Sequence, residues 1–248
     1  MVPQGDPFIH CPGLRDLIKE PGTSFFRNFD PAALARDLEA KGIPTDWWTS
    51  EADREAGRRA FLDQHVGDLW VFGYGSLMWD PGFHFEEVRR ATVSGYARGF
   101  ILKDIHGGRG DRQRPGLMVA LDHDPDGPGC HGLAFRIAAE KVDEETFHIW
   151  QRERIGPAYT EAMVPAETAQ GAFQAATFIA DHGSELIDAA LTFEEQVEYS
   201  ATGEGFLGTS LDYIRGIATH FAEMRIEDVE VARLLAAAEA RAAKLGIG

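Results

Sequence analysis

The chain has 248 residues and a formal net charge of −16, with 40 acidic side chains against 24 lysines and arginines. A surface this acidic repels phosphate backbones and anionic lipid headgroups, so nucleic acids and membranes are poor candidates for partners. Hydrophobic residues at 44% and charged residues at 26% are typical of a globular protein and argue against a disordered chain.

The chain's cellular location is predicted from its cysteines and its apolar segments. Cys11 and Cys130 lie far apart, which predicts no disulfide framework and favours a reducing compartment. The first residues lack a basic segment followed by an apolar run, so we expect no signal peptide. No stretch approaches the roughly 18 apolar residues of a membrane helix. We therefore expect a cytoplasmic protein.

The N-terminal region begins with an irregular arm. Residues 1–29 are rich in proline, glycine and isolated aromatic residues. A helix is predicted to follow, with Asp30 as its N-cap and Pro31 at its first position. It should run to about Lys41 and end at Gly42.

A second helix is predicted at 51–65. Ser50 is a good N-cap for it, and Asp53 occupies the capping-box position three residues later. The sequence leaves open whether this helical extension, residues 1–68, is an appendage or packs on the rest of the chain.

After residue 68 the pattern changes to short strands. The apolar run 69–72 ends in a glycine pair, which predicts a buried strand followed by a turn. Further strands are predicted at 91–102, 117–122, 132–137, 159–164 and 173–179. Helices are predicted at 142–155, 193–202, 210–224 and 227–245.

This order of elements predicts an α+β fold. Short strands with turn signals at their ends, one inserted helix and trailing helices favour a mixed β-barrel with flanking helices, not a doubly wound sheet. We expect an extension at 1–68, a barrel domain at 69–225 and a C-terminal helix at 226–248 that packs on it.

Several common classes of catalytic or cofactor site are excluded because their sequence motifs are incomplete or absent. Gly73-Tyr74-Gly75 begins like a dinucleotide fingerprint, but Met78 stands where the third glycine is needed. Ser76 is not in a nucleophile elbow for the same reason. The nine histidines include no pair spaced for a helical metal site, and no phosphate-binding Gly-Lys-Ser/Thr occurs. We therefore expect neither cofactor nor metal.

The turn after the first strand is one candidate site. Gly73 and Gly75 directly follow the buried strand, and without a Cβ their backbone N–H groups can approach a ligand closely. Such a turn can hold a carboxylate or stabilise an oxyanion. An ordinary tight turn is the alternative interpretation.

The mid-chain helix supplies a second candidate. Val142, Thr146, Ile149 and Trp150 form one largely apolar stripe at helical spacing. The next position of that stripe carries Glu153, so we expect its carboxylate to face the interior.

The predicted position of Glu153 suits proton transfer. Burial and the negative end of the helix dipole both disfavour the ionised carboxylate, which raises its pKa. A carboxyl group with a raised pKa is useful as a general acid or base. The alternative is a structural carboxylate that is paired with Arg152 or Arg154 or reaches solvent at the helix end.

Four stretches, taken together and in this order, carry a family resemblance. They are Val71 to Trp79 with Pro81-Gly82-Phe83, Gly95 to Phe100 with Pro115-Gly116-Leu117, Arg152-Glu153 with Gly156 to Tyr159, and Gly203 to Thr209 with Asp212-Tyr213-Ile214. They resemble the ChaC family of γ-glutamyl cyclotransferases over about residues 69–225. Asp111 stands after Arg109-Gly110 where that family usually has threonine, and residues 1–68 have no counterpart.

The resemblance implies a small β-barrel with flanking helices and assigns roles to residues. It makes Glu153 the catalytic residue and Tyr213 a substrate contact. It implies that the γ-glutamyl pocket is lined by Tyr74, Gly75, Ser76 and Leu77.

The resemblance further implies a lyase that cleaves glutathione to 5-oxoproline and Cys-Gly. The substrate's α-amine would attack its own γ-carbonyl, with Glu153 as general acid and base. Alternatives are a cyclotransferase for another γ-glutamyl amino acid or amine, a non-catalytic binding protein on the same fold, and an acidic scaffold that assembles through its alanine-rich last helix. The sequence leaves the oligomeric state open.

Overall fold

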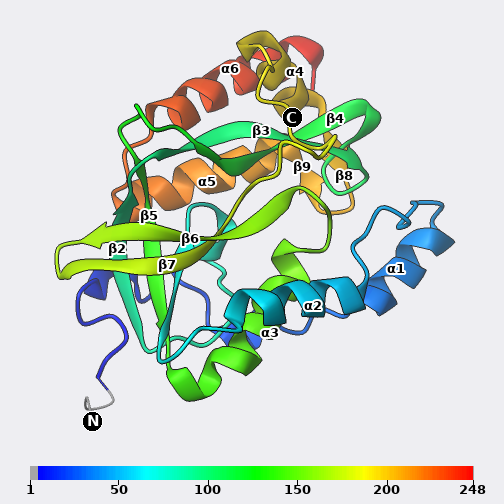
Figure 1. The fold of residues 1–248 in the computed structure, drawn as a ribbon. Coiled ribbons are helices and arrows are strands. Elements are labelled where there is room, and N and C mark those ends of the chain that lie inside the picture. The colour runs from blue at the N-terminus through cyan, green and yellow to red at the C-terminus, as the bar shows by residue number, and fades with distance from the viewer. Residues whose placement is uncertain (1–4, 248) are drawn as a thin grey trace.

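The computed structural model describes residues 5–247, so residues 1–4 of the predicted arm and residue 248 lie outside the described part (Figure 1). The helices are α1 (Pro31–Ala40), α2 (Glu51–Leu62), α3 (Val142–Glu153), α4 (Phe193–Thr202), α5 (Ser210–Met224) and α6 (Val229–Leu245). The strands are β1 (Leu69–Gly73), β2 (Glu87–Val93), β3 (Tyr96–His106), β4 (Asp111–His123), β5 (Cys130–Ile137), β6 (Tyr159–Thr168), β7 (Gly171–Ala180), β8 (Glu204–Gly205) and β9 (Gly208–Thr209). Short 3₁₀ turns lie at Pro12–Leu14, Pro21–Thr23, Ser76–Met78 and Ala139–Lys141.

Five of the strands pair in a closed circuit. The order is β1-β5-β2-β6-β7, and β7 returns to β1 through a parallel pairing at Trp70↔Ala175 and Val71↔Ala176. The other four pairings of the circuit are antiparallel. Closure leaves no free edge in this part of the sheet and fixes where β1 ends.

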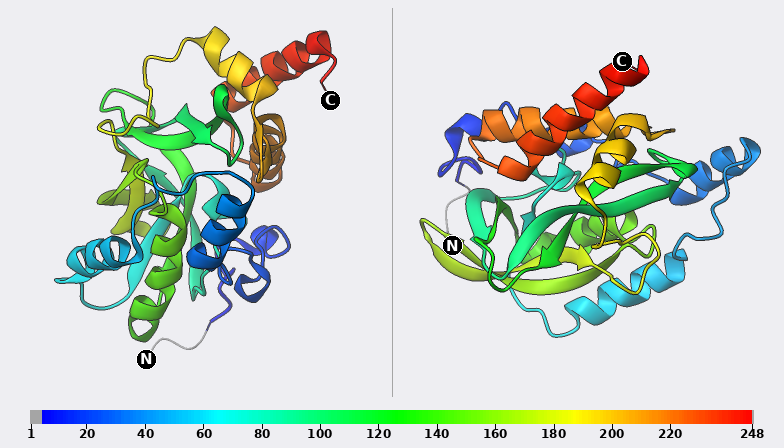
Figure 2. Two further views of the ribbon diagram at one scale, coloured as in Figure 1. Left: turned by 90° about the vertical axis from the view of Figure 1, so that its right-hand side faces the viewer. Right: turned by 90° about the horizontal axis from the view of Figure 1, so that it is seen from above.

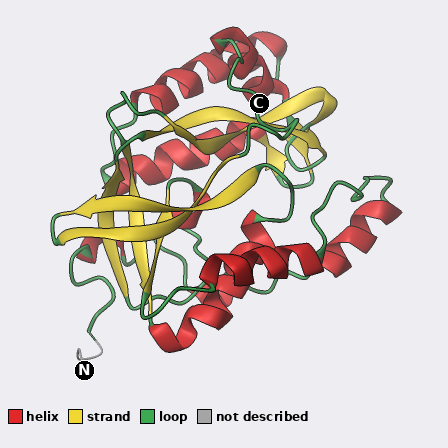
Figure 3. Cartoon of the chain, in the orientation of Figure 1, coloured by secondary structure: helices red, strands yellow, loops and turns green. Residues whose placement is uncertain are grey.

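The hairpin of β3 and β4 extends the sheet beyond the barrel. β4 joins the far end of β7 in parallel, at Leu121↔Ile179. Helices α4, α5 and α6 pack on one another beside this hairpin, whereas α2 packs on α3 at the opposite side of the sheet (Figures 1 and 2). The strands therefore lie between two groups of helices (Figure 3).

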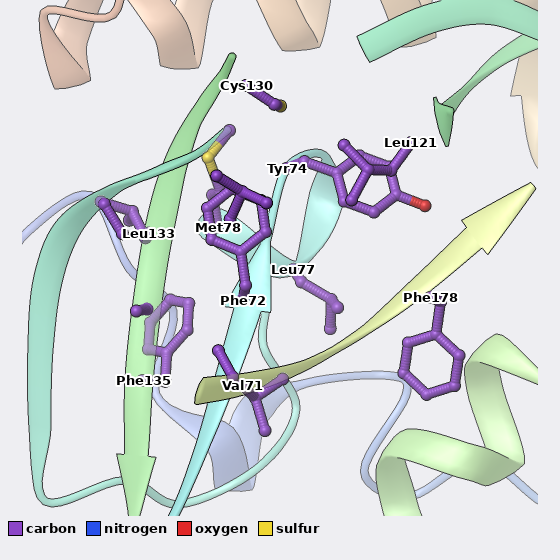
Figure 4. Packing of buried hydrophobic residues seen from close by; sticks show 14 of the residues in the cluster. Val71, Phe72, Tyr74, Leu77, Met78, Leu121, Cys130, Leu133, Phe135 and Phe178 are labelled. Atoms are coloured by element: carbon purple, nitrogen blue, oxygen red, sulfur yellow. The ribbon is translucent and has the colours of Figure 1, made fainter. Parts of the chain in front are cut away.

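The barrel interior is filled by large apolar side chains. Phe72, Leu133 and Phe135 from β1 and β5 are fully buried, and Phe178 of β7 packs beside α3 (Figure 4). Burying each such side chain contributes about 1.5–3 kcal/mol relative to exposure. The run of apolar residues in β1 is thus explained by a strand that is buried on both faces.

The predicted α+β fold, a mixed β-barrel with flanking helices, is confirmed. The helices at 193–202 and 210–224 have the predicted bounds, and α1 begins at Pro31 with the Asp30 side chain accepting a hydrogen bond from the Ala33 N–H. The predicted helices at 51–65 and 142–155 end a few residues earlier, at Leu62 and Glu153. No described helix is both long and apolar enough to cross a bilayer.

The single strand predicted at 91–102 is wrong. The chain turns at Ser94-Gly95, where Gly95 has a φ of 80°, and continues as a separate strand, β3. A positive φ is readily adopted only by glycine, and the apolar residues on both sides conceal the break. The strand predicted at 117–122 begins earlier than expected, because β4 starts at Asp111 and forms a hairpin with β3.

The N-terminal extension packs on the rest of the molecule. Phe8 and Leu14 belong to the same apolar cluster as the barrel core. In α2, the buried Arg58 donates hydrogen bonds of 2.9 Å to the Asp143 carbonyl and the Thr146 hydroxyl of α3. The question that the sequence left open is therefore answered in favour of packing, while the boundaries at 69 and 226 stay predictions.

Candidate active site

A cavity of about 540 Å³ lies where the turn after β1, the end of α3 and the start of α5 meet. Three of the predicted site residues line it, namely Ser76, Glu153 and Tyr213. They come from three segments that lie far apart in the sequence, and the fold brings them together. A volume of this size is typical of small-molecule sites.

The turn after β1 is held tightly against β4. A methyl group at Gly75 would lie 3.2 Å from the Val119 Cγ2, so a larger residue would push the turn away from this strand. The hydrogen bonds of the turn leave the backbone N–H groups of Gly75 and Ser76 without an acceptor among residues 5–247. Of these two residues, Ser76 lines the cavity, where its N–H group could meet a negatively charged group.

Glu153 is paired with the neighbouring Arg152. The Arg152 Nε lies 2.8 Å from the Glu153 Oε1, and the Glu153 side chain is only 14% exposed. Arg152 also donates to the Asp80 carbonyl at 2.6 Å and to the Ser76 hydroxyl. Glu153 is therefore ion-paired with Arg152 and also lines the cavity, and its catalytic role stays a prediction.

Burial dominates the electrostatics around Glu153. It raises the pKa of the Glu153 carboxyl above its ordinary value, and the charge of Arg152 partly opposes this. Burial also raises the pKa of the Tyr74, Tyr159 and Tyr213 hydroxyls, and the nearby Glu153 charge raises each further. All three hydroxyls therefore stay protonated at neutral pH. Tyr159 and Tyr213 line the cavity.

The other predicted residues of the turn lie behind the cavity surface. The side chains of Tyr74 and Leu77 are buried among core residues, and Tyr74 points toward Leu121 (Figure 4). Neither they nor Gly75 line the cavity. Their roles in substrate binding therefore stay predictions.

Arg109 is a cavity residue that sequence reasoning did not select. Its Nη1 donates to the Thr209 carbonyl at 3.1 Å, and its guanidinium lies 4.8 Å from the Tyr213 ring centre. No carboxylate pairs with it among residues 5–247. The buried Asp104 accepts from the backbone of Gly108 and Arg109 and fixes the loop.

The N-terminal extension forms another side of the cavity. Sequence reasoning missed this, because the aromatic residues concerned follow no helical or strand period. They are Phe25, Phe26, Phe29, Trp47 and Trp48.

The described residues offer no set of side chains arranged to bind a metal ion. Within residues 5–247, no group of three or more histidine, cysteine, aspartate or glutamate side chains is placed to hold a metal ion. The chemistry available from the described residues is therefore that of Glu153, Arg109, Arg152, the tyrosine hydroxyls and the free N–H groups of the turn.

Comparison with known proteins identifies relatives of the barrel region. Residues 69–241 match the family described as ChaC-like protein. The glutathione-specific gamma-glutamylcyclotransferase of Escherichia coli is 30% identical over 178 residues, which are 68% of this chain and 75% of that protein. Glutathione-specific gamma-glutamylcyclotransferase 1 of Danio rerio is 30% identical over 166 residues, which are 65% of this chain and 83% of that protein.

A solved structure shares the fold. The crystal structure of a yeast gamma-glutamyl cyclotransferase specific to glutathione aligns with a TM-score of 0.63 at 20% identity, covering 70% of this chain and 96% of that one. The barrel and its flanking helices are thus common to both. Because the family match spans well over half of the sequence, the chain belongs to the ChaC-like family.

Proposed function

We propose that this protein is a γ-glutamyl cyclotransferase, a lyase that cleaves glutathione into 5-oxoproline and Cys-Gly. One observation carries the proposal: the buried carboxyl of Glu153, with its raised pKa, lines the same cavity as Ser76 of the glycine turn. The Escherichia coli and Danio rerio relatives, both named as glutathione-specific enzymes, support glutathione as the substrate.

The substrate supplies its own nucleophile. The α-amine of a γ-glutamyl group can reach the γ-carbonyl carbon and close a five-membered lactam. Holding the two groups together inside a cavity gives the effective-molarity advantage of an intramolecular reaction, which can lower the barrier by roughly 7–11 kcal/mol. The protein's tasks are to fold the substrate, move protons and stabilise the oxyanion.

Glu153 is the proton carrier in this proposal. The carboxylate takes a proton from the α-ammonium, and the free amine forms a bond to the γ-carbon. When the amide C–N bond breaks, the Glu153 carboxylic acid gives its proton to the departing nitrogen. The lactam nitrogen loses a second proton and the released amine gains one, so the reaction balances without a net change of charge.

The glycine turn stabilises the developing negative charge. The N–H group of Ser76, a residue that lines the cavity, is assigned to the oxyanion on the γ-carbonyl oxygen. A donor in such a position contributes roughly 3 kcal/mol to the transition state. The role of Tyr74 and Leu77 is then to hold this backbone from the core side.

One cation and one tyrosine hydroxyl are assigned to substrate binding. Arg109, which has no carboxylate partner among the described residues, is assigned to a substrate carboxylate. Tyr213 lies beside it and supplies a protonated hydroxyl near Glu153. Arg152 is a positioning residue, because it contacts both Glu153 and Ser76.

The proposed location is the cytoplasm, and the proposed domain boundary lies at residue 69. Cys11 and Cys130 are buried free thiols, which supports the cytoplasm as the reducing compartment in which the reaction takes place. The start of the family match at residue 69 supports an extension at 1–68 and a barrel domain from 69. The match runs on to 241, past the second proposed boundary at 225.

A substrate panel tests the proposed function. Purified protein is incubated with glutathione, γ-glutamyl dipeptides and a γ-glutamyl amine, and 5-oxoproline is quantified in each reaction. Release from glutathione is the expected result. Release only from another γ-glutamyl compound would change the substrate, and release from none would leave a binding protein on this fold.

A further inference from the structure

Five aromatic residues of the N-terminal extension line the cavity and form what we call the aromatic wall: Phe25, Phe26, Phe29, Trp47 and Trp48. They face the cavity from a segment that lies wholly outside the family match at 69–241. The wall therefore comes from a part of the chain that the family match does not include, and it carries no charge of its own.

The aromatic wall is fixed to the barrel domain at two places. Arg27 forms an ion pair of 2.5 Å with Glu145 of α3, and Glu145 also accepts from the His84 N–H at 2.9 Å. The Thr49 N–H donates to the Ile155 carbonyl at 2.9 Å, two residues beyond Glu153. The wall is thus part of the cavity's fixed structure.

Several apolar residues that line the cavity are also exposed to solvent. Phe25 of the wall is 54% exposed, and Phe206, in the turn between β8 and β9, is 40% exposed. Both residues line the cavity, as does the exposed Leu207. Large exposed apolar groups around a cavity mark a ligand site, because leaving them in water costs free energy that a bound apolar group recovers.

A γ-glutamyl group offers no apolar surface that could pack against the aromatic wall. That group is polar, and the proposed function places it at the glycine turn and Glu153. The part of the substrate beyond the scissile amide is therefore the part that meets the wall. Arg109 lies in the same cavity and has no carboxylate partner among the described residues, so this leaving part combines a carboxylate with an apolar group.

We propose that the enzyme acts on S-substituted glutathiones, whose thioether carries a bulky apolar or aromatic group that packs between the aromatic wall and Phe206. This inference rests on the proposed function and narrows its substrate class. The cysteinyl thiol is the side-chain functional group of glutathione at which an apolar substituent leaves both carboxylates and the α-amine free.

The test compares S-benzylglutathione with glutathione. We expect wild-type kcat/KM for S-benzylglutathione to be at least as high as that for glutathione. Phe25→Ala and Phe206→Ala should each lower kcat/KM for S-benzylglutathione about tenfold, as expected for loss of a buried aromatic contact, and change it less than about twofold for glutathione. Both residues are exposed, so the variants should fold.

Phe147→Ala is the matched control. Phe147 is 38% exposed on α3 and does not line this cavity. Its removal should leave both substrates unaffected. Equal losses for both substrates in the Phe25 and Phe206 variants, or a wild-type enzyme that uses S-benzylglutathione less well than glutathione, would overturn the inference.

A binding measurement separates this inference from the proposed reaction. The Glu153→Gln variant should bind S-benzylglutathione more tightly than glutathione in calorimetry, and adding Phe25→Ala should remove the difference. If S-benzylglutathione binds more tightly but the wild type releases no 5-oxoproline, the apolar subsite is supported and the proposed reaction is rejected. Turnover of glutathione without preferential binding of S-benzylglutathione would keep the reaction and reject the subsite.

Discussion

The Arg152 guanidinium joins Glu153 to the glycine turn. Its Nε lies 2.8 Å from the Glu153 Oε1, while its Nη2 donates to the Ser76 hydroxyl. Phe26 of the aromatic wall covers the guanidinium at 3.9 Å from the ring centre. One cation thus fixes the relative positions of the proposed proton carrier and the proposed oxyanion site.

Replacing Arg152 should impair catalysis and shift its pH dependence. In Arg152→Met we expect kcat to fall about 100-fold, because a displacement near 1 Å at a catalytic group has effects of that order. The charge of Arg152 lowers the pKa of Glu153, so its removal should move the acidic limb of the pH–rate profile upward. Steady-state kinetics across a pH series measures both effects.

Arg154→Met is the control for that experiment. Arg154 lies at the same helix end but pairs with Glu161 at 3.1 Å, not with Glu153. The acidic limb of the pH–rate profile of Arg154→Met should stay at the same pH as in the wild type. If both variants shift the limb equally, the assigned role of Arg152 is wrong.

The pKa of Glu153 also predicts a stability effect. Burial raises it above 4.5 in the folded protein, so the folded state binds more protons than the unfolded state between 4.5 and the raised pKa. The contribution of Glu153 to the free energy of unfolding is therefore fully present below pH 4.5. It is lost as the pH rises from 4.5 through the raised pKa. At neutral pH, Glu153→Gln should have a higher free energy of unfolding than the wild type.

Urea denaturation of wild type and Glu153→Gln at several pH values measures this difference. The extra stability of Glu153→Gln should shrink toward zero below pH 4.5, where the wild-type carboxyl is protonated in both the folded and the unfolded state. A variant that is less stable than the wild type at neutral pH would contradict a raised pKa.

The aromatic wall should depend on the buried ion pair between Arg27 and Glu145. The Glu145 side chain is 2% exposed, so Glu145→Ala removes the buried partner of the Arg27 guanidinium and should lower the free energy of unfolding by about 3 kcal/mol. Glu144 also pairs with Arg27, but it is 67% exposed, and Glu144→Ala should cost at most about 1 kcal/mol. Equal losses in denaturant titrations would rule out a special role for the buried pair.

The sequence predicted the parts of the site that follow a local period. Glu153 lies on the apolar stripe of α3, and residues of that stripe such as Ile149 and Trp150 are buried as expected. The glycine turn was located because a short apolar run precedes it. Local patterns were sufficient where one element determines which way a side chain faces.

The sequence did not predict contacts between distant irregular segments. Phe25 and Trp47 lie outside regular helices, so no periodicity marks the face that they present to the cavity. Glu145 was missed because an acidic residue in the first turn of α3 has the ordinary explanation of a helix-dipole partner. The break at Gly95 was hidden because strand-like residues continue on both sides of it.

Shortening the Glu153 side chain tests the need for accurate placement. Glu153→Asp keeps the carboxylate but moves it back by about 1 Å, which should lower kcat about 100-fold with little change in KM. The pair with Arg152 should persist in part, so thermal unfolding should be close to that of the wild type. Near wild-type kcat would show that the position of the carboxylate is not critical.

The most direct test of the account is the release of 5-oxoproline from glutathione by Glu153→Gln. The amide is similar in size to the carboxyl group but cannot accept the α-ammonium proton. With an unchanged circular dichroism spectrum as evidence of folding, the account predicts no 5-oxoproline above background from this variant and turnover by the wild type. Turnover by Glu153→Gln near the wild-type rate would contradict the assignment of Glu153 as the proton carrier.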